Sequence, residues 1–177
     1  MKVKLLSVAT IVALFFASCG GVDKGLVDKI TKFEGDWTSM VTHVNGVSDT
    51  MILTAEETTK ACEEACSQEC TDKKMITHMD TMKQVCNNAK EGMTSTITNI
   101  TDFKIKLKTA TDEFAAWKEK VMKGEIKAEE AGKALDEYRA KLTDAQDQLL
   151  AFQTNFDASA KECTSSCTAT KECCEKK

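Results

Sequence analysis

Apolar residues recur along most of the chain at alternating intervals of three and four positions. This spacing places side chains along one face of an α-helix and is typical of the seam between the helices of a coiled coil. The pattern keeps one register within each of three segments and changes register between them. It therefore predicts three long helices, over about residues 24–70, 75–122 and 128–170.

The predicted seam positions are nearly all apolar. In the first segment they are Leu26, Ile30, Phe33, Trp37, Met40, Val44, Val47, Met51, Thr54 and Thr58. In the second they are Met79, Met82, Cys86, Ala89, Met93, Thr96, Ile100, Phe103, Leu107, Ala110, Phe114, Trp117 and Val121. In the third they are Ala128, Ala131, Leu135, Tyr138, Leu142, Ala145, Leu149, Phe152 and Phe156.

Two polar breaks separate the segments. Residues 71–74 are Thr-Asp-Lys-Lys, and Thr71 or Asp72 is a suitable N-cap. Gly124 follows a lysine and is a suitable helix stop, while the acidic residues 129–130 suit a first helical turn. Because the three segments are of similar length, they predict an elongated, antiparallel three-helix coiled-coil bundle about 65–70 Å long.

One dipeptide conflicts with an unbroken first helix. Asn45-Gly46 is a strong turn signal. The seam nevertheless passes through it in register, from Val44 to Val47, so we expect a continuous helix, with a break near Gly46 as the alternative. Residues 93–98 are rich in β-branched side chains, which favour strands, but the long helical pattern around them should override that preference.

The N-terminus has the features of an export signal. Lys2 and Lys4 precede an apolar stretch over residues 5–17, which is shorter than the roughly 20 residues of a transmembrane helix. The stretch ends in Phe16-Ala17-Ser18-Cys19-Gly20-Gly21, which resembles the lipobox of bacterial lipoproteins, with Phe16 in place of the usual leucine. The resemblance implies cleavage before Cys19 and attachment of diacylglycerol, with acyl chains such as palmitate, to its sulfur.

This resemblance divides the chain into three parts. We expect a signal peptide over residues 1–18, a lipidated Cys19 with a short tether over 19–25, and a helical domain over 26–177. The protein would then be anchored by lipid to a bacterial membrane and face the periplasm or the cell exterior. The inner and outer membranes, and their leaflets, remain alternatives.

Composition narrows the function classes. The 177 residues include no proline, 8 glycines and 29% charged residues, a profile that suits long helices rather than a loop-rich enzyme. The net charge is −4 and becomes more negative when the signal with its two lysines is removed. Nucleic acid is therefore not an expected partner. An acidic body is also repelled by anionic membranes, so the lipid should provide attachment.

The nine cysteines are the main candidate chemistry, and export permits disulfides. Eight remain after Cys19 and are disulfide candidates: Cys62, Cys66, Cys70, Cys86, Cys163, Cys167, Cys173 and Cys174. Folding the chain at its two breaks brings all eight to one end of the rod. Cysteines four apart on one helix are separated too far for a disulfide, so bonds between helices are expected.

Several pairings fit this arrangement. We expect Cys86 to pair with Cys163 or Cys62, Cys66 with Cys167, and Cys70 with Cys173 or Cys174. A Cys86–Cys163 bond would close a long loop, contributing about 4 kcal/mol in the chain-entropy account. Reduction should loosen this end of the rod, which is otherwise polar.

Metal binding by the cysteines is the alternative. The Cys-x3-Cys spacing resembles the cysteine-lined interior of helical copper storage proteins, although here the cysteines occupy one end only. Thiolate and thioether groups are soft ligands for Cu(I) or Zn(II), and Met75, His78, Met79 and Met82 lie near the cysteine end. The simpler interpretation is disulfides, with the methionines packed in the core and no bound cofactor.

No residue pattern indicates catalysis. A Cys-x-x-Cys motif and a glycine-rich phosphate loop are absent from the sequence, and neither His43 nor His78 has a nucleophile beside it. We therefore expect a membrane-anchored envelope lipoprotein that acts as a helical structural or protein-docking module, with another envelope protein as its partner. The alternatives are periplasmic metal buffering through the cysteines and a helical chaperone for exported chains.

Overall fold

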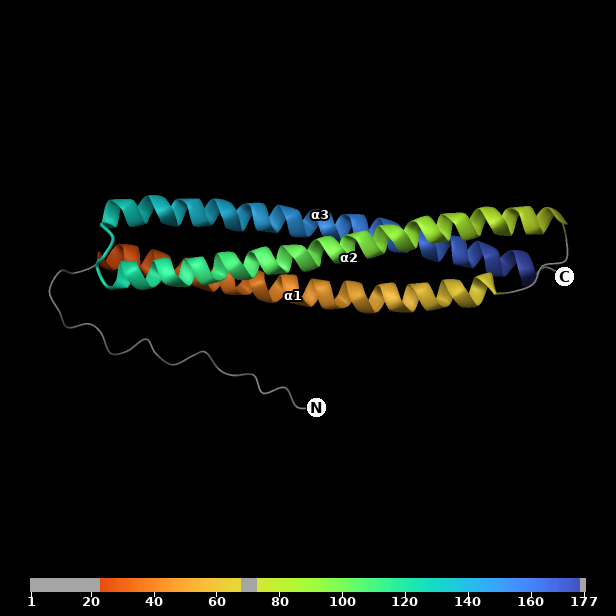
Figure 1. The fold of residues 1–177 in the computed structure, drawn as a ribbon, viewed down its shortest axis with the longest axis horizontal. Coiled ribbons are helices and arrows are strands. Elements are labelled where there is room, and N and C mark those ends of the chain that lie inside the picture. Colours follow the sequence, from red (N-terminus) through yellow and green to blue (C-terminus); the bar gives the residue numbers. More distant parts are fainter. Residues whose placement is uncertain (1–22, 68–72, 176–177) are drawn as a thin grey trace, which may run out of the picture.

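The chain forms three long helices packed side by side into a rod. The computed structural model describes residues 23–67 and 73–175, except for the side chains of residues 66, 73–75, 78 and 172–175. Helix α1 spans Lys24–Cys66, α2 spans Lys73–Met122 and α3 spans Ala128–Glu175. Helix α2 runs opposite to α1 and α3 (Figure 1). The predicted all-α, antiparallel three-helix bundle is confirmed.

The helix boundaries differ from the predicted ones at the cysteine end. Helix α1 ends at Cys66 rather than near residue 70, and Ser67 closes it by donating its backbone N–H to Glu63 O at 3.0 Å. Helix α3 instead continues to Glu175, beyond the predicted limit near residue 170. Helix α2 begins at Lys73, and the capping residue expected at Thr71 or Asp72 lies outside the described residues.

Local capping explains the other ends. Asp23 is the N-cap of α1, and its carboxylate accepts the N–H of Leu26 at 2.9 Å. Gly124 adopts φ 71°, a left-handed conformation that suits glycine, and its N–H reaches Val121 O at 2.9 Å. The acidic first turn of α3 is also present. The predicted helix stop at Gly124 is therefore confirmed.

The predicted seams form the core. Ile30, Met93, Ile100 and Leu135 are among the largest fully buried side chains. Near the start of α1, five aromatic rings pack together with centroid distances of 5.1–6.4 Å; they belong to Phe33, Trp37, Phe114, Trp117 and Tyr138. Both tryptophans therefore serve packing, as the seam predicts.

The seam is displaced by one residue in the middle of α1. Val47 is only partly buried, whereas Ser48 is 1% exposed and accepts a hydrogen bond from Lys104 Nζ at 3.4 Å. An ideal helix turns about 20° per heptad relative to a strict 3.5-residue repeat, so the buried face moves to the next position. Ala128, the first predicted seam residue of α3, is exposed because the buried face begins at Ala131.

Neither the turn signal at Gly46 nor the strand-favouring residues 93–98 interrupt a helix. Helix α1 is continuous through Gly46, as expected, and residues 93–98 are helical within α2. The hydroxyl of Thr96 donates to Gly92 O at 3.0 Å and that of Thr98 to Thr94 O at 3.0 Å. These bonds return the polar groups to the helix's own backbone, so β-branched residues fit within a tertiary core.

The two flanks of the rod on either side of α1 differ in character. Between α1 and α2, cross-helix ion pairs join Glu34 to Lys118, Asp49 to Lys104 and Glu63 to Lys90. Between α1 and α3, a row of three surface hollows of about 440, 580 and 350 Å³ runs along the rod. We call this row the α1/α3 groove.

None of the helices in the described ranges has an apolar stretch long enough to span a bilayer.

Candidate functional site

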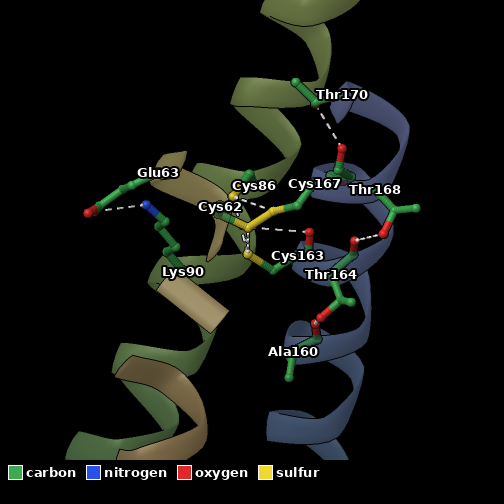
Figure 2. Close-up of a disulfide and its surroundings, with 11 residues drawn as sticks. Cys62, Glu63, Cys86, Lys90, Ala160, Cys163, Thr164, Cys167, Thr168 and Thr170 are labelled. Atoms are coloured by element: carbon green, nitrogen blue, oxygen red, sulfur yellow. Dashed lines mark hydrogen bonds and ion pairs between the residues drawn. A yellow bond between two sulfur atoms is a disulfide. The ribbon is translucent and has the colours of Figure 1, made fainter. Parts of the chain in front are cut away.

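Four cysteines from three helices meet inside the rod. Cys62 comes from α1, Cys86 from α2, and Cys163 and Cys167 from successive turns of α3. All four are buried, and their sulfur atoms lie within 4.8 Å of one another (Figure 2). We call these residues the sulfur cluster. They are separated by up to 105 positions in sequence, and only the folding of the three helices brings them together.

A disulfide within the sulfur cluster links the two parallel helices. Cys62 of α1 is bonded to Cys167 of α3, with 5.1 Å between their Cα atoms (Figure 2). This separation is ordinary for a disulfide. The expected bond between Cys66 and Cys167 is therefore wrong. Cys66 lies one helical turn beyond the level of Cys167 and is rotated about 40° around the axis, so the α1–α3 register favours Cys62 instead.

Cys86 brings α2 into the same cluster. Its sulfur lies 3.2 Å from Cys163 Sγ and 3.9 Å from Cys167 Sγ. Cys86 and Cys163 are therefore neighbours, but their sulfurs are not bonded to each other, so the expected disulfide between them is not formed. The alternative pairing of Cys86 with Cys62 is wrong, because Cys62 is bonded to Cys167. Cys163 Sγ in turn lies 2.7 Å from Cys62 Sγ, and Cys62 Sγ also contacts the carbonyl oxygen of Cys163 at 3.5 Å. Each cluster sulfur therefore has at least one other sulfur as a close neighbour.

A polar layer lies next to the sulfurs on α3. Ser166 and Thr170 are buried, 5% and 1% exposed, and the Thr170 hydroxyl donates to Ser166 O at 2.8 Å. The predicted seam of the third helix ends at Phe156 and does not include these two residues. The sequence does contain a signal, because Ser166 and Thr170 follow Cys163 at intervals of three and four positions, as the residues of a seam do. The core at this level is therefore built from small polar and sulfur-containing side chains.

The disulfide lies beneath the end of the α1/α3 groove. A hollow of about 350 Å³ is lined by Glu57, Thr58, Ala61, Cys62, Thr164, Cys167, Thr168 and Lys171. Its rim carries one acidic and one basic side chain. On the other side of Cys62, the exposed pair Lys90–Glu63 joins α2 to α1 at 3.3 Å. The hollow therefore brings solvent close to Cys167, which is 6% exposed, while Cys62 beside it is fully buried.

The other predicted site residues are only partly placed. Cys66 is the last residue of α1, and Cys173 and Cys174 lie in the last turns of α3, but their side chains are outside the described residues. Cys19 and Cys70 lie outside the described residues entirely, and so does the side chain of His78. His43 is exposed on α1, as expected for a solvated helix position, and lines the α1/α3 groove.

Among the described residues, the sulfur cluster offers the clearest chemistry. Its sulfurs can be oxidised to disulfides, and in reduced form they are soft ligands. Met79, also buried, belongs to the same end of the core. Comparison with known proteins adds no assignment: the chain matches no known protein family, no curated protein and no solved structure.

Proposed function

We propose that this chain is an exported bacterial lipoprotein whose helical rod acts as a structural spacer and protein-docking module. Cys19 carries the lipid, and the rod extends from the membrane into the periplasm or the cell exterior. The proposal includes no catalytic step. The lipid would attach one end of the rod to the membrane. The disulfide-linked helical body would hold the docking surface at a distance from the membrane.

The observation that carries this proposal is the Cys62–Cys167 disulfide across the rod. Stable disulfides form in exported proteins and are rare in the reducing cytosol. The bond also lies far from the proposed anchor. Helix α1 begins at Lys24, close to Cys19 in sequence, and Cys62 follows at a helical distance of about 57 Å. The lipid and the disulfide would therefore occupy opposite ends.

The α1/α3 groove supports the docking role. Leu150 is 63% exposed and lines the groove together with Met40 and Leu149. Exposed apolar side chains beside a groove between two helices are suited to packing against a helix of a partner protein. We therefore propose another envelope protein as the partner on this flank.

The anchor is tested by replacing Cys19. We expect the parent protein to sediment with membranes and to yield an N-terminal peptide that starts at lipidated Cys19. Cys19→Ser, in a variant whose residues 1–18 are replaced by a signal peptide that is cleaved without lipidation, should abolish the lipid and release the protein from the membrane fraction, because the lipid provides the attachment. Equal membrane association of both proteins, or an unmodified Cys19 in the parent, would contradict the proposal.

The docking surface is tested by site-specific photo-crosslinking in intact cells. A photoreactive residue at position 150, in the α1/α3 groove, should give a discrete adduct with one envelope protein. The matched control is Glu129, which is exposed at the start of α3. Equal adducts from both positions would exclude a specific docking face. Suppression of aggregation of many exported clients would favour the chaperone function instead.

A further inference from the structure

We propose that the reduced protein binds one Zn²⁺ ion through the sulfurs of the sulfur cluster. The ligands would be Cys62, Cys86, Cys163 and Cys167, contributed by all three helices. The bound ion would join the helices at the level where the Cys62–Cys167 bond joins two of them. This inference does not depend on the lipid anchor or on a docking partner.

The positions of the sulfurs support a four-coordinate site. Tetrahedral zinc has Zn–S bonds of about 2.3 Å, which places its ligand sulfurs about 3.8 Å apart. Cys86 Sγ already lies 3.2 Å from Cys163 Sγ and 3.9 Å from Cys167 Sγ, and every pair in the cluster is within 4.8 Å. Once the Cys62–Cys167 bond is reduced, those two sulfurs must separate and the others need only small shifts.

The donor set selects the class of metal. Four thiolates are soft ligands, whereas Ca²⁺ and Mg²⁺ require oxygen ligands. A site with four protein ligands and no open position is typical of structural zinc rather than catalytic zinc. The burial of all four cysteines agrees with a closed site.

The approach of Zn²⁺ and the fate of the electrons and thiol protons can both be accounted for. Cys62 and Cys167 border the hollow at the end of the α1/α3 groove, so this is the side from which an ion would approach the cluster. A dithiol reductant would supply two electrons and two protons to the Cys62–Cys167 bond and itself become a disulfide. Binding of Zn²⁺ would then release the four thiol protons to the buffer.

The test uses a full-length four-cysteine variant, which keeps only the sulfur cluster. It carries Cys19→Ser, Cys66→Ser, Cys70→Ser, Cys173→Ser and Cys174→Ser. Under anaerobic reducing conditions we expect one Co²⁺ per chain, with the visible absorption of a tetrahedral thiolate site, and displacement of Co²⁺ by Zn²⁺. Native mass spectrometry should show one Zn²⁺ per chain. The oxidised variant should bind neither ion tightly.

The matched control adds Cys86→Ala to the four-cysteine variant. Cys86 does not take part in the Cys62–Cys167 disulfide, so that bond and the helix content by circular dichroism report whether the control still folds. Its affinity for Zn²⁺ should fall more than about 100-fold, because a direct ligand is lost. Cys163→Ala is the second control if Cys86→Ala lowers helix content.

Two results would overturn the proposal. One is a reduced, helical four-cysteine variant that does not bind Zn²⁺. The other is tight binding that survives removal of Cys86 and of Cys163. The first result, together with binding by a chain that retains only Cys66, Cys70, Cys173 and Cys174, would place the metal elsewhere.

Discussion

At the scale of single residues, the two tryptophans of the aromatic core differ in what their indole N–H groups meet. Trp37 Nε1 donates to Thr111 Oγ1 at 2.8 Å. The Nε1 atom of Trp117 is buried and has no hydrogen-bond partner within the described part of the chain. A buried donor left without a partner costs about 1–3 kcal/mol, whereas a satisfied one contributes about 1 kcal/mol. The two residues should therefore respond differently to the same substitution.

We predict that Trp37→Phe destabilises the fold by about 1–2 kcal/mol more than Trp117→Phe does. Trp37 is 3% exposed, whereas Trp117 is only partly buried, so the first change also removes more buried apolar area. Only the first change removes a hydrogen bond, and the second removes an unsatisfied donor. Urea unfolding of the two variants and the parent measures the difference. A larger loss for Trp117→Phe would show that its indole N–H is paired in solution.

Tyr138 has an ionisation that reports on the same core. Burial raises the pKa of its phenol above 10.0, and the nearby carboxylates of Glu113 and Glu137 raise this pKa further. Because the folded state favours the neutral phenol, the contribution of Tyr138 to the free energy of unfolding should be fully retained below pH 10. It should fall as the pH rises through the folded pKa.

The phenol can be followed directly, because Tyr138 is the only tyrosine in the chain. We predict that phenolate absorbance appears at higher pH in the folded protein than in the protein unfolded by urea. Tyr138→Phe should remove the signal and this part of the alkaline destabilisation. Identical titration curves for the folded and unfolded protein would contradict a buried phenol.

At the scale of the helices, the glycines within α1 and α2 occupy different surroundings. A Cβ atom added at Gly35 or Gly46 would meet nothing within 4 Å. One added at Gly92 would lie 2.6 Å from Ser159 Oγ, where α2 approaches α3. Glycine within a helix is less favourable than alanine by about 0.5–1 kcal/mol. Replacing Gly35 or Gly46 by alanine should therefore stabilise the helix without a steric cost.

We predict that Gly35→Ala and Gly46→Ala each stabilise the protein by about 0.5–1 kcal/mol. Gly92→Ala is the matched control and should gain less, because the Ser159 side chain must rotate away. Thermal unfolding followed by circular dichroism measures all three. A loss of stability at Gly46 would indicate that α1 needs flexibility at that position.

The end of the rod with the sulfur cluster should depend on its disulfide. Beyond Cys62, α1 continues for only one further turn, and the neighbouring core contains Ser166 and Thr170 rather than large apolar groups. We predict that reduction increases amide hydrogen exchange in residues 57–66 and 160–175, while residues 26–56 keep their protection. Unchanged protection at the cluster end after reduction would contradict this dependence.

At the scale of the whole molecule, the Cys62–Cys167 bond spans 105 positions of sequence. Such a bond restricts the unfolded chain, and the chain-entropy account assigns it about 4–5 kcal/mol. We predict a loss of this order when the four-cysteine variant is reduced in the absence of metal, measured by urea unfolding. The same variant with Cys62→Ala and Cys167→Ala should not respond to reductant. An equal response in that control would place the effect elsewhere.

The sequence by itself determined the three helices, their antiparallel order and the glycine stop at position 124. These follow from local periodicity and capping, which act between residues close in sequence. The approach of Cys86 to Cys163 also followed, because folding two helices of known length about one short turn leaves little freedom in their register.

Only the tertiary structure decided which cysteine of α1 meets Cys167, and that Ser48 rather than Val47 faces inward. Each residue turns a helix by about 100°, so a register difference of one position redirects a side chain. Helices α1 and α3 are not adjacent in sequence, and their register is set by packing along the whole rod. A strict repeat read from the sequence cannot contain that adjustment, because it arises from the mutual fit of all three helices.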